Sequence, residues 1–134
     1  MKTTENTERT ENKRDPLTEE VIGCAIEVHR HLGPGLLEST YERCLAHELG
    51  RTNLSFKTQA SMPIYYKGVN LDCGYRVDLL VENYLVIELK SVSQLTKLHE
   101  AQLLTYMKLA EAPTGLLINF NVKLLKDGIK RFAL

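Results

Sequence analysis

Apolar residues recur at helical spacing in two segments near the start of the chain, residues 18–32 and residues 37–49. The stripes consist of Val21, Ala25, Val28 and Leu32 in the first segment and of Leu37, Tyr41, Leu45 and Leu49 in the second. Thr18 is the predicted N-cap of the first helix, because its hydroxyl can accept a hydrogen bond from a free backbone N–H. The Gly33-Pro34-Gly35 segment ends this helix, and Gly50 ends the second.

The period changes to that of β-strands after residue 54. Residues 55–66 alternate loosely and are predicted to form one strand, either continuous or broken at Pro63, which is followed by a turn at Lys67-Gly68. Two further strands are predicted over residues 71–81 and 85–91, on either side of a short turn. This central pair of strands forms a β-hairpin.

A third helix over residues 96–110 and a buried strand over residues 115–120 follow, with Pro113 between them as a stop. Residues 122–125 and 129–132 flank Asp127-Gly128, a strong hairpin signal, so we expect a C-terminal hairpin. The order is α-α-β-β-β-α-β plus this hairpin. It indicates an α/β fold with a mixed β-sheet flanked by helices.

A polar segment precedes this predicted domain. Residues 1–15 contain no apolar residue after Met1, so they have nothing to bury and are expected to be a disordered tail. Residues 16–134 are expected to form a single domain, since this length suffices for one hydrophobic core.

Composition removes several classes of function. Lys and Arg number 17, as do Asp and Glu, and a net charge of zero does not favour an avid, nonspecific nucleic-acid binder, although a local basic patch remains open. Cys24, Cys44 and Cys73 form no C-x-x-C pair and are interpreted as reduced thiols of a cytosolic protein. No apolar run is long enough to span a membrane, and the first residues do not resemble a signal peptide. The expected compartment is the cytoplasm.

Charged residues interrupt the apolar strands of the central hairpin. Asp78 lies in the first strand, and Glu88 and Lys90 lie two apart in the second, so that both leave the same face. An unpaired charge is costly to bury, and a divalent metal ion such as Mg²⁺ or Mn²⁺ is the natural partner of carboxylate oxygens. The alternative is a surface salt bridge between Glu88 and Lys90 on an edge strand, which would contribute little. That alternative does not explain why the charges interrupt the apolar run.

The register of the hairpin decides whether the two carboxylates meet. If Val81 paired with Tyr84 across a two-residue turn, Asp78 would face away from Glu88. If Val81 pairs with Leu85 across a three-residue loop, Asp78 lies opposite Glu88 with Cβ atoms about 5 Å apart. A bulge would give the same result. We predict the loop or the bulge.

Other polar residues offer weaker signals. His99 lies near the start of the third helix, where it could contact a phosphate. His29, His31 and His47 have no ligand spacing and are interpreted as residues of helix surfaces. The cations Lys123, Lys126, Lys130 and Arg131 could follow a phosphate backbone, or form an ordinary solvated face.

The chain resembles a known family over residues 17–132. Asp78 followed by Glu88-x-Lys90 on a hairpin resembles the PD-(D/E)XK nuclease superfamily, although Val77 replaces the proline of the first motif. Gly35-x-x-Glu38-x-x-Tyr41, within LGPGLLESTYERCL, is similar to the signature of the small bacterial GxxExxY proteins, a branch of that superfamily. Further similar segments are VHRHLGPG, ELKSV, AQLLTYMKL and the NF of LLINF. This resemblance implies a restriction-endonuclease-like core.

The resemblance also implies roles for individual residues. Asp78, Glu88 and Glu38 are the implied metal ligands, and Lys90 and Gln102 complete the implied catalytic set. Tyr106, His99 and Tyr41 are the implied substrate contacts. The alternatives are an exposed Glu38, a Tyr41 that covers the rim of the core, and ordinary packing of Gln102 and Tyr106 on a polar helix edge.

Two functions of different classes follow. The first is metal-dependent hydrolysis of phosphodiester bonds in DNA or RNA, with Mg²⁺ or Mn²⁺ as cofactor. The second is a non-catalytic module that keeps the fold and binds nucleic acid or a protein partner. The complete set of two acids and a lysine favours the first. The neutral charge and small size favour the second, and they make a homodimer a reasonable expectation, because one small domain offers little surface to hold a duplex.

Overall fold

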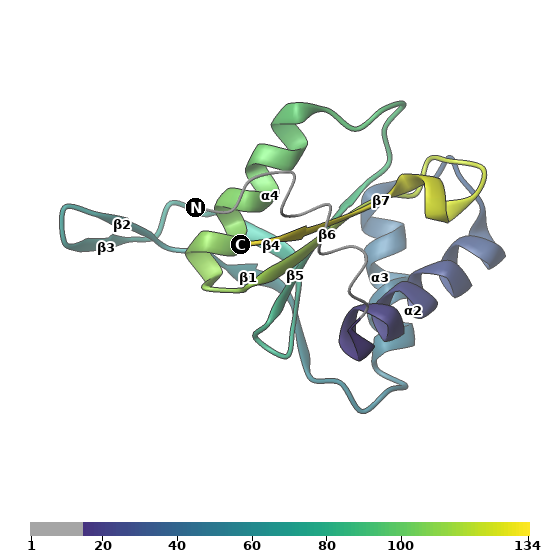
Figure 1. The fold of residues 1–134 in the computed structure, drawn as a ribbon, viewed down its shortest axis with the longest axis horizontal. Helices are drawn as coiled ribbons and strands as arrows, with labels where there is room; N and C mark the ends of the chain where they lie inside the picture. The colour runs from purple at the N-terminus through teal and green to yellow at the C-terminus, as the bar shows by residue number, and fades with distance from the viewer. Residues whose placement is uncertain (1–14) are drawn as a thin grey trace.

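The protein was analysed as a computed structural model, which describes residues 15–134. The predicted tail therefore lies outside the described residues, except for Asp15. A five-stranded mixed sheet has the order β1-β4-β5-β6-β7 (Figure 1). Helices α2 and α3 pack on one face and α4 on the other, and each face has its own hydrophobic core. The predicted fold class, a mixed α/β sheet flanked by helices, is confirmed.

The first two helices match the predicted stripes except where the helices adjoin, because Leu32 and Leu37 are exposed. Helix α2 spans Pro16–Leu32 and α3 spans Glu38–Leu49. The predicted N-cap at Thr18 is wrong: the cap is Asp15, whose Oδ1 accepts a hydrogen bond from the Thr18 backbone N–H at 2.7 Å. Pro16 explains the shift, because proline suits the first turn of a helix, where its missing N–H is not needed.

A parallel pair of strands lies at the centre of the sheet. Strand β4, Arg76–Val81, is antiparallel to β5, Leu85–Lys90, and β5 is parallel to β6, Thr114–Asn119. Helix α4, Lys97–Ala110, is the crossover between β5 and β6. All six residues of β6 are buried, as expected for a strand covered by helices on both faces.

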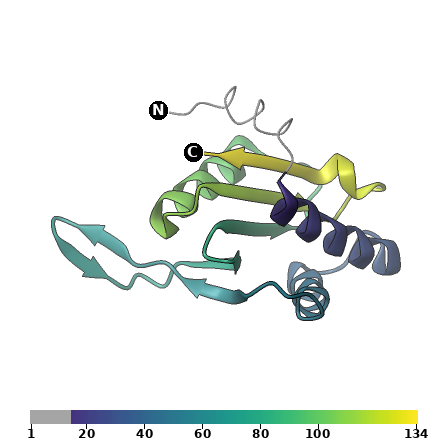
Figure 2. The same ribbon diagram turned by 60° about the horizontal axis from the view of Figure 1, so that its bottom comes forward.

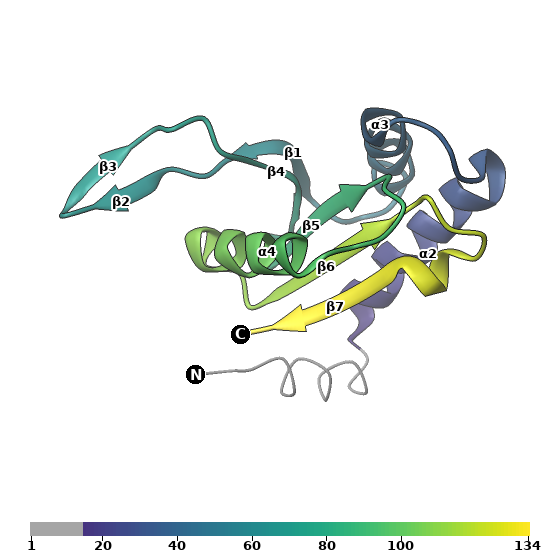
Figure 3. The ribbon, with the colours of Figure 1, turned by 90° about the horizontal axis from the view of Figure 1, so that it is seen from above.

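A two-stranded arm projects from the body of the molecule (Figures 2 and 3). The segment after α3 forms β1, Phe56–Ser61, and β2, Ile64–Tyr66, so the break at Pro63 is confirmed. The single strand predicted over residues 71–81 is wrong, because the chain forms β3, Val69–Leu71, and then β4. Strands β2 and β3 pair only with each other. We call residues 64–71 the arm.

The predicted C-terminal hairpin is wrong. Leu125–Gly128 form a short 3₁₀ helix, η1, and β7, Ile129–Ala133, pairs antiparallel with β6. The backbone at Gly128 passes so close to β6 that an added Cβ would lie 2.2 Å from the Asn119 carbonyl oxygen. The Asp-Gly pair therefore serves a tight turn against the end of β6. Among residues 15–134, no helix is long and apolar enough to cross a membrane.

Candidate active site

The β4–β5 hairpin places Asp78 opposite Glu88. Val81 pairs with Leu85 across a three-residue loop, so the predicted register is confirmed. Glu82 and Asn83 accommodate this loop with positive φ angles of 56° and 50°. The two acids are also joined through the backbone. The Asp78 N–H donates to Glu88 Oε2 at 2.9 Å, and the Leu89 N–H donates to Asp78 Oδ2 at 2.8 Å. One oxygen of each carboxylate is thereby held in place.

Lys90 provides the positive charge of this site. It follows Glu88 by two residues on β5, so its side chain leaves the same face, and it is half-buried. Its charge lowers the pKa of both Asp78 and Glu88, although this effect is smaller than that of burial. The ammonium group is therefore close enough to act on both carboxylates.

Helix α3 contributes two further carboxylates. Glu38 is its first residue, and Glu38 Oε2 accepts a hydrogen bond from the Ser91 N–H, just beyond β5, at 3.2 Å. Glu42 lies one turn later and was not predicted from the sequence. Burial, and after it the charge of Asp78, raises the pKa of Glu42. Its spacing of four from Glu38 was the available signal, because residues i and i+4 share a helix face.

Gln59 connects α3 to the central hairpin and was also missed. Its Nε2 donates to Glu42 Oε1 at 2.7 Å and to Asp78 Oδ1 at 3.3 Å. The β1–β4 register places Gln59 opposite Asp78, and Gln59 has a φ of 50°, in the left-handed region that a non-glycine residue avoids. Such local strain within a strand is typical of functional sites. No sequence pattern marks it.

The charged forms of Asp78 and Glu88 are destabilised by burial and by neighbouring acids. Burial, followed by repulsion from Asp78, raises the pKa of Glu88 from 4.5 to about 7. Burial also raises the pKa of Asp78, and the charge of Glu38 adds a smaller contribution. Titratable groups perturbed by burial and by a specific neighbour are typical of active sites. Here several acids surround a single lysine, and this arrangement favours the arrival of a cation.

Helix α4 covers the same side of the hairpin. Tyr106 is buried, and burial, followed by the charge of Glu88, raises the pKa of its hydroxyl. Gln102 is exposed, and its Nε2 donates to the Tyr106 hydroxyl at 3.1 Å. The structure therefore brings Tyr106, with Gln102 attached, towards Glu88. His99 instead caps α4, because its Nδ1 accepts from the Thr96 N–H at 3.1 Å.

Tyr41 does not reach the surface of the site. Its side chain is fully buried and stacks on Phe120 with ring centroids 4.3 Å apart. Its hydroxyl donates to the Gly33 carbonyl and accepts from the Leu36 N–H at 3.2 Å. Tyr41 therefore fixes the loop between α2 and α3, from which Glu38 emerges.

The donor set fits a hard divalent cation. Among the residues that the structure describes, no three His, Cys, Asp or Glu side chains are grouped so as to hold a metal ion by themselves. Mg²⁺, however, is usually held by one or two protein carboxylates together with water and substrate phosphates. The facing pair of Asp78 and Glu88 meets that requirement.

One comparison with known proteins gave a match. Residues 15–132 match a family model described as the PD-(D/E)XK nuclease superfamily. Neither the curated proteins nor the solved structures contain a match to this chain.

Proposed function

The chain belongs to the PD-(D/E)XK nuclease superfamily, and we propose that it is a divalent-metal-dependent nuclease that hydrolyses phosphodiester bonds in DNA or RNA. One observation carries the proposal: the half-buried Asp78 and the buried Glu88 face each other across β4 and β5, with raised pKa values, beside Lys90. A purely structural ion pair would not need a second and a third carboxylate at the same place.

Nucleases of this superfamily generally depend on a divalent metal ion. In the proposal Asp78 and Glu88 would hold Mg²⁺ or Mn²⁺ together with water, and Glu38, at the start of α3, would be the further ligand. When bound, such an ion makes an attacking water more acidic and neutralises charge on a phosphate. Burial raises the pKa of Glu88 to about 7, and a bound cation would favour its carboxylate form.

The other residues act on the substrate. Lys90, on the same side as Glu88, stabilises the negative charge that develops on the phosphate in the transition state. Gln102 is placed by its hydrogen bond to Tyr106 and contacts the attacking water or the substrate backbone. His99 and Tyr106 are further contacts to the strand in this proposal, whereas Tyr41 acts only by positioning Glu38.

We further propose that the chain belongs to the GxxExxY branch. The geometry of its signature supports this assignment. Gly35 has a φ of 99°, which favours glycine, Tyr41 fastens the loop, and Glu38 begins α3 beside β5. All three signature residues therefore serve to place one carboxylate. We also propose that residues 16–134 form a single domain and that the protein is located in the cytoplasm.

The second candidate, a non-catalytic binding module, has one observation in its favour. The backbone N–H groups of Asp78 and Leu89 already engage one oxygen of each central carboxylate. Carboxylates that already accept backbone hydrogen bonds can have a structural role without binding a metal ion or taking part in catalysis.

The test is degradation of labelled single-stranded and double-stranded DNA and RNA in Mn²⁺ or Mg²⁺. We expect the wild type to cut, and Asp78→Asn or added EDTA to abolish cutting. The matched control is Asp72→Asn, at an exposed aspartate just after the arm. An Asp78→Asn protein that cuts as fast as the wild type would refute the proposed site. A wild type that binds no metal by calorimetry and cuts nothing would favour the binding module.

A further inference from the structure

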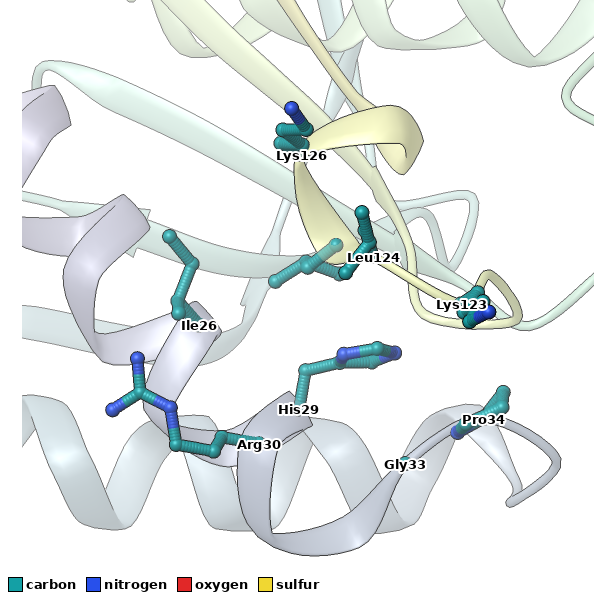
Figure 4. A pocket seen from close by; sticks show the side chains of 9 residues that line it. Ile26, His29, Arg30, Gly33, Pro34, Lys123, Leu124 and Lys126 are labelled. Atoms are coloured by element: carbon teal, nitrogen blue, oxygen red, sulfur yellow. The ribbon is translucent and has the colours of Figure 1, made fainter.

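A hollow whose chemistry differs from that of the acidic site lies beside the loop between α2 and α3. It has a volume of about 500 Å³ and lies between the last turns of α2 and the segment around η1 (Figure 4). Its lining includes Ile26, His29, Arg30, Lys123, Leu124 and Lys126. We call this hollow the basic pocket.

The lining of the basic pocket contains three cations and no acid. Arg30, Lys123 and Lys126 line the pocket, and no Asp or Glu does. Of the four C-terminal cations noted in the sequence, Lys130 pairs with Glu100 at 2.6 Å and Arg131 pairs with Glu19 at 3.1 Å. Among residues 15–134, no ion-pair partner is found for Lys123 or Lys126. Arg30 pairs with Glu27 at 3.4 Å. The charge left for a ligand at this pocket is therefore that of Lys123 and Lys126.

The pocket also has an apolar wall. Ile26 and Pro34 contribute to it from the side of α2, and Leu124 does so from the opposite side (Figure 4). Leu124 is 53% exposed, so packing in the core does not account for its position. An apolar surface beside cations suits a ligand with a phosphate and a flat, largely apolar portion, which is the chemistry of a nucleotide.

The base of the pocket is fixed rather than mobile. His29, predicted as a surface residue, is in fact buried, and its Nε2 lies 2.8 Å from the Val122 carbonyl oxygen. Its ring also lies against Phe120, with centroids 6.1 Å apart. These contacts hold the segment that carries Lys123 against the last turn of α2. The pocket is thus preformed.

Two connections place the basic pocket beside the acidic site. Lys90 is paired with Asn119 at the carboxyl ends of the parallel strands β5 and β6, and the pocket segment follows directly after β6. In α/β sheets, ligands bind at these ends. The α2–α3 loop provides the second connection. Gly33 lines the pocket, and the Leu36 carbonyl of the same loop accepts from Ser91 Oγ at 2.7 Å.

We propose that the basic pocket binds one nucleotide of the substrate strand, with its phosphate near Lys123 and Lys126 and its base or sugar on Leu124 and Ile26. This inference rests on the proposed nuclease function. It adds a subsite that holds the strand beyond the α2–α3 loop while the scissile phosphate occupies the acidic site.

The test measures binding of a fluorescein-labelled single-stranded 12-mer in EDTA, where the strand is not cut. Lys123→Ala/Lys126→Ala is compared with Lys57→Ala/Lys108→Ala, which removes the same charge at exposed lysines outside the pocket. We expect the pocket variant to bind about tenfold more weakly in 0.1 M salt, and its salt slope to fall by about 1.4, the value for two lost phosphate contacts. The control variant should change neither quantity appreciably.

A second measurement tests the apolar wall. In NMR titrations, adenosine 5′-monophosphate should shift the amides of residues 26–34 and 122–126 and should bind more tightly than inorganic phosphate. Leu124→Ser should weaken binding of the nucleotide about threefold without affecting binding of phosphate.

The inference is overturned if both lysine pairs weaken binding equally, if neither does, or if the wild type binds neither probe. These outcomes are distinct from failure of the nuclease proposal. Normal cleavage by Lys123→Ala/Lys126→Ala with unchanged KM would reject the pocket and keep the active site. If the protein binds the nucleotide in the basic pocket but cuts no substrate, the pocket is kept and the nuclease proposal is rejected.

Discussion

The two hairpins that follow α3, the arm and the β4–β5 hairpin, differ in opposite ways from the usual distribution of polar and apolar residues. The β4–β5 hairpin lies between two layers of helices and carries Asp78, Glu88 and Lys90 among buried apolar residues. The arm projects into solvent, yet it exposes large apolar side chains, including Tyr65 at 73% and Tyr66 at 59%. Each hairpin therefore departs from the rule that charged side chains are exposed and large apolar side chains are buried. The first tolerates its charges because the surrounding core over-determines their position, and the second has no such support.

The largest expected difference between the hairpins is in stability. Leu79→Ala should lower the free energy of unfolding by about 3 kcal/mol, because Leu79 is fully buried and its removal leaves a cavity. Leu71→Ala, on the arm, should cost less than about 0.5 kcal/mol, because Leu71 is 42% exposed. Urea denaturation measures both. Equal losses would show that the arm is part of the cooperative core.

A second comparison concerns the lysines. Lys90→Met should reduce the cleavage rate about 100-fold, the usual effect of removing one group that stabilises transition-state charge. Lys67→Met, at the exposed turn of the arm, should leave the rate within about twofold of wild type. Single-turnover assays measure the cleavage rate of both variants, and equal rates would contradict the proposed role of Lys90. Binding of the oligonucleotide in EDTA controls for lost affinity.

The third prediction concerns pH. Because the folded pKa of Glu88 is about 7 against an ordinary value of 4.5, the folded protein keeps a proton that the unfolded chain releases. Its contribution to stability is full below pH 4.5 and is lost as the pH rises through about 7. Glu88→Gln should therefore be more stable than the wild type at pH 8 in EDTA, by roughly 3 kcal/mol, and close to it near pH 4.5.

Urea denaturation of both proteins at several pH values tests this prediction. Added Mg²⁺ should reduce the advantage of Glu88→Gln, because the cation stabilises the ionised wild type. A Glu88→Gln protein that is less stable than the wild type at pH 8 would contradict the electrostatic account.

The smallest expected effect concerns two strained residues, Gln59 and Lys67, with φ angles of 50° and 51°. Gln59→Gly should change stability by no more than about 1 kcal/mol, because relief of the backbone strain offsets the lost hydrogen bonds. It should nevertheless slow cleavage several-fold, because Asp78 and Glu42 lose their bridge. Lys67→Gly should relieve similar strain with no effect on cleavage. Thermal unfolding and initial rates measure both, and an unchanged rate for Gln59→Gly would place Gln59 outside the active site.

The sequence predicted the local parts of this structure well. Helical stripes located α2 and α3, and the parity of a three-residue loop brought Asp78 opposite Glu88. The errors occurred where a tertiary contact decides local structure. Asp127-Gly128 carries a hairpin signal, but Gly128 turns against Asn119 instead.

The candidate site shows the same limit. Glu42 and Gln59 come from elements that meet the hairpin only in three dimensions, so no spacing along the chain connects them to Asp78. The burial of His29 likewise depends on the distant Val122 carbonyl. The degree of burial that raises the pKa of Glu88 is also a property of the packed layers and not of the strand.

The base of the arm has a consequence for how this protein can vary. The chain leaves the sheet at Ser61 and returns at Arg76, which are paired partners, and the Met62 N–H donates to the Tyr75 carbonyl at 2.8 Å. Everything beyond this closed junction can be lengthened, shortened or exchanged without altering the register of β1 on β4, since added loop length costs little. A different arm could therefore be attached at this junction to provide a new recognition surface, while Asp78, two residues after Arg76, keeps its position opposite Glu88.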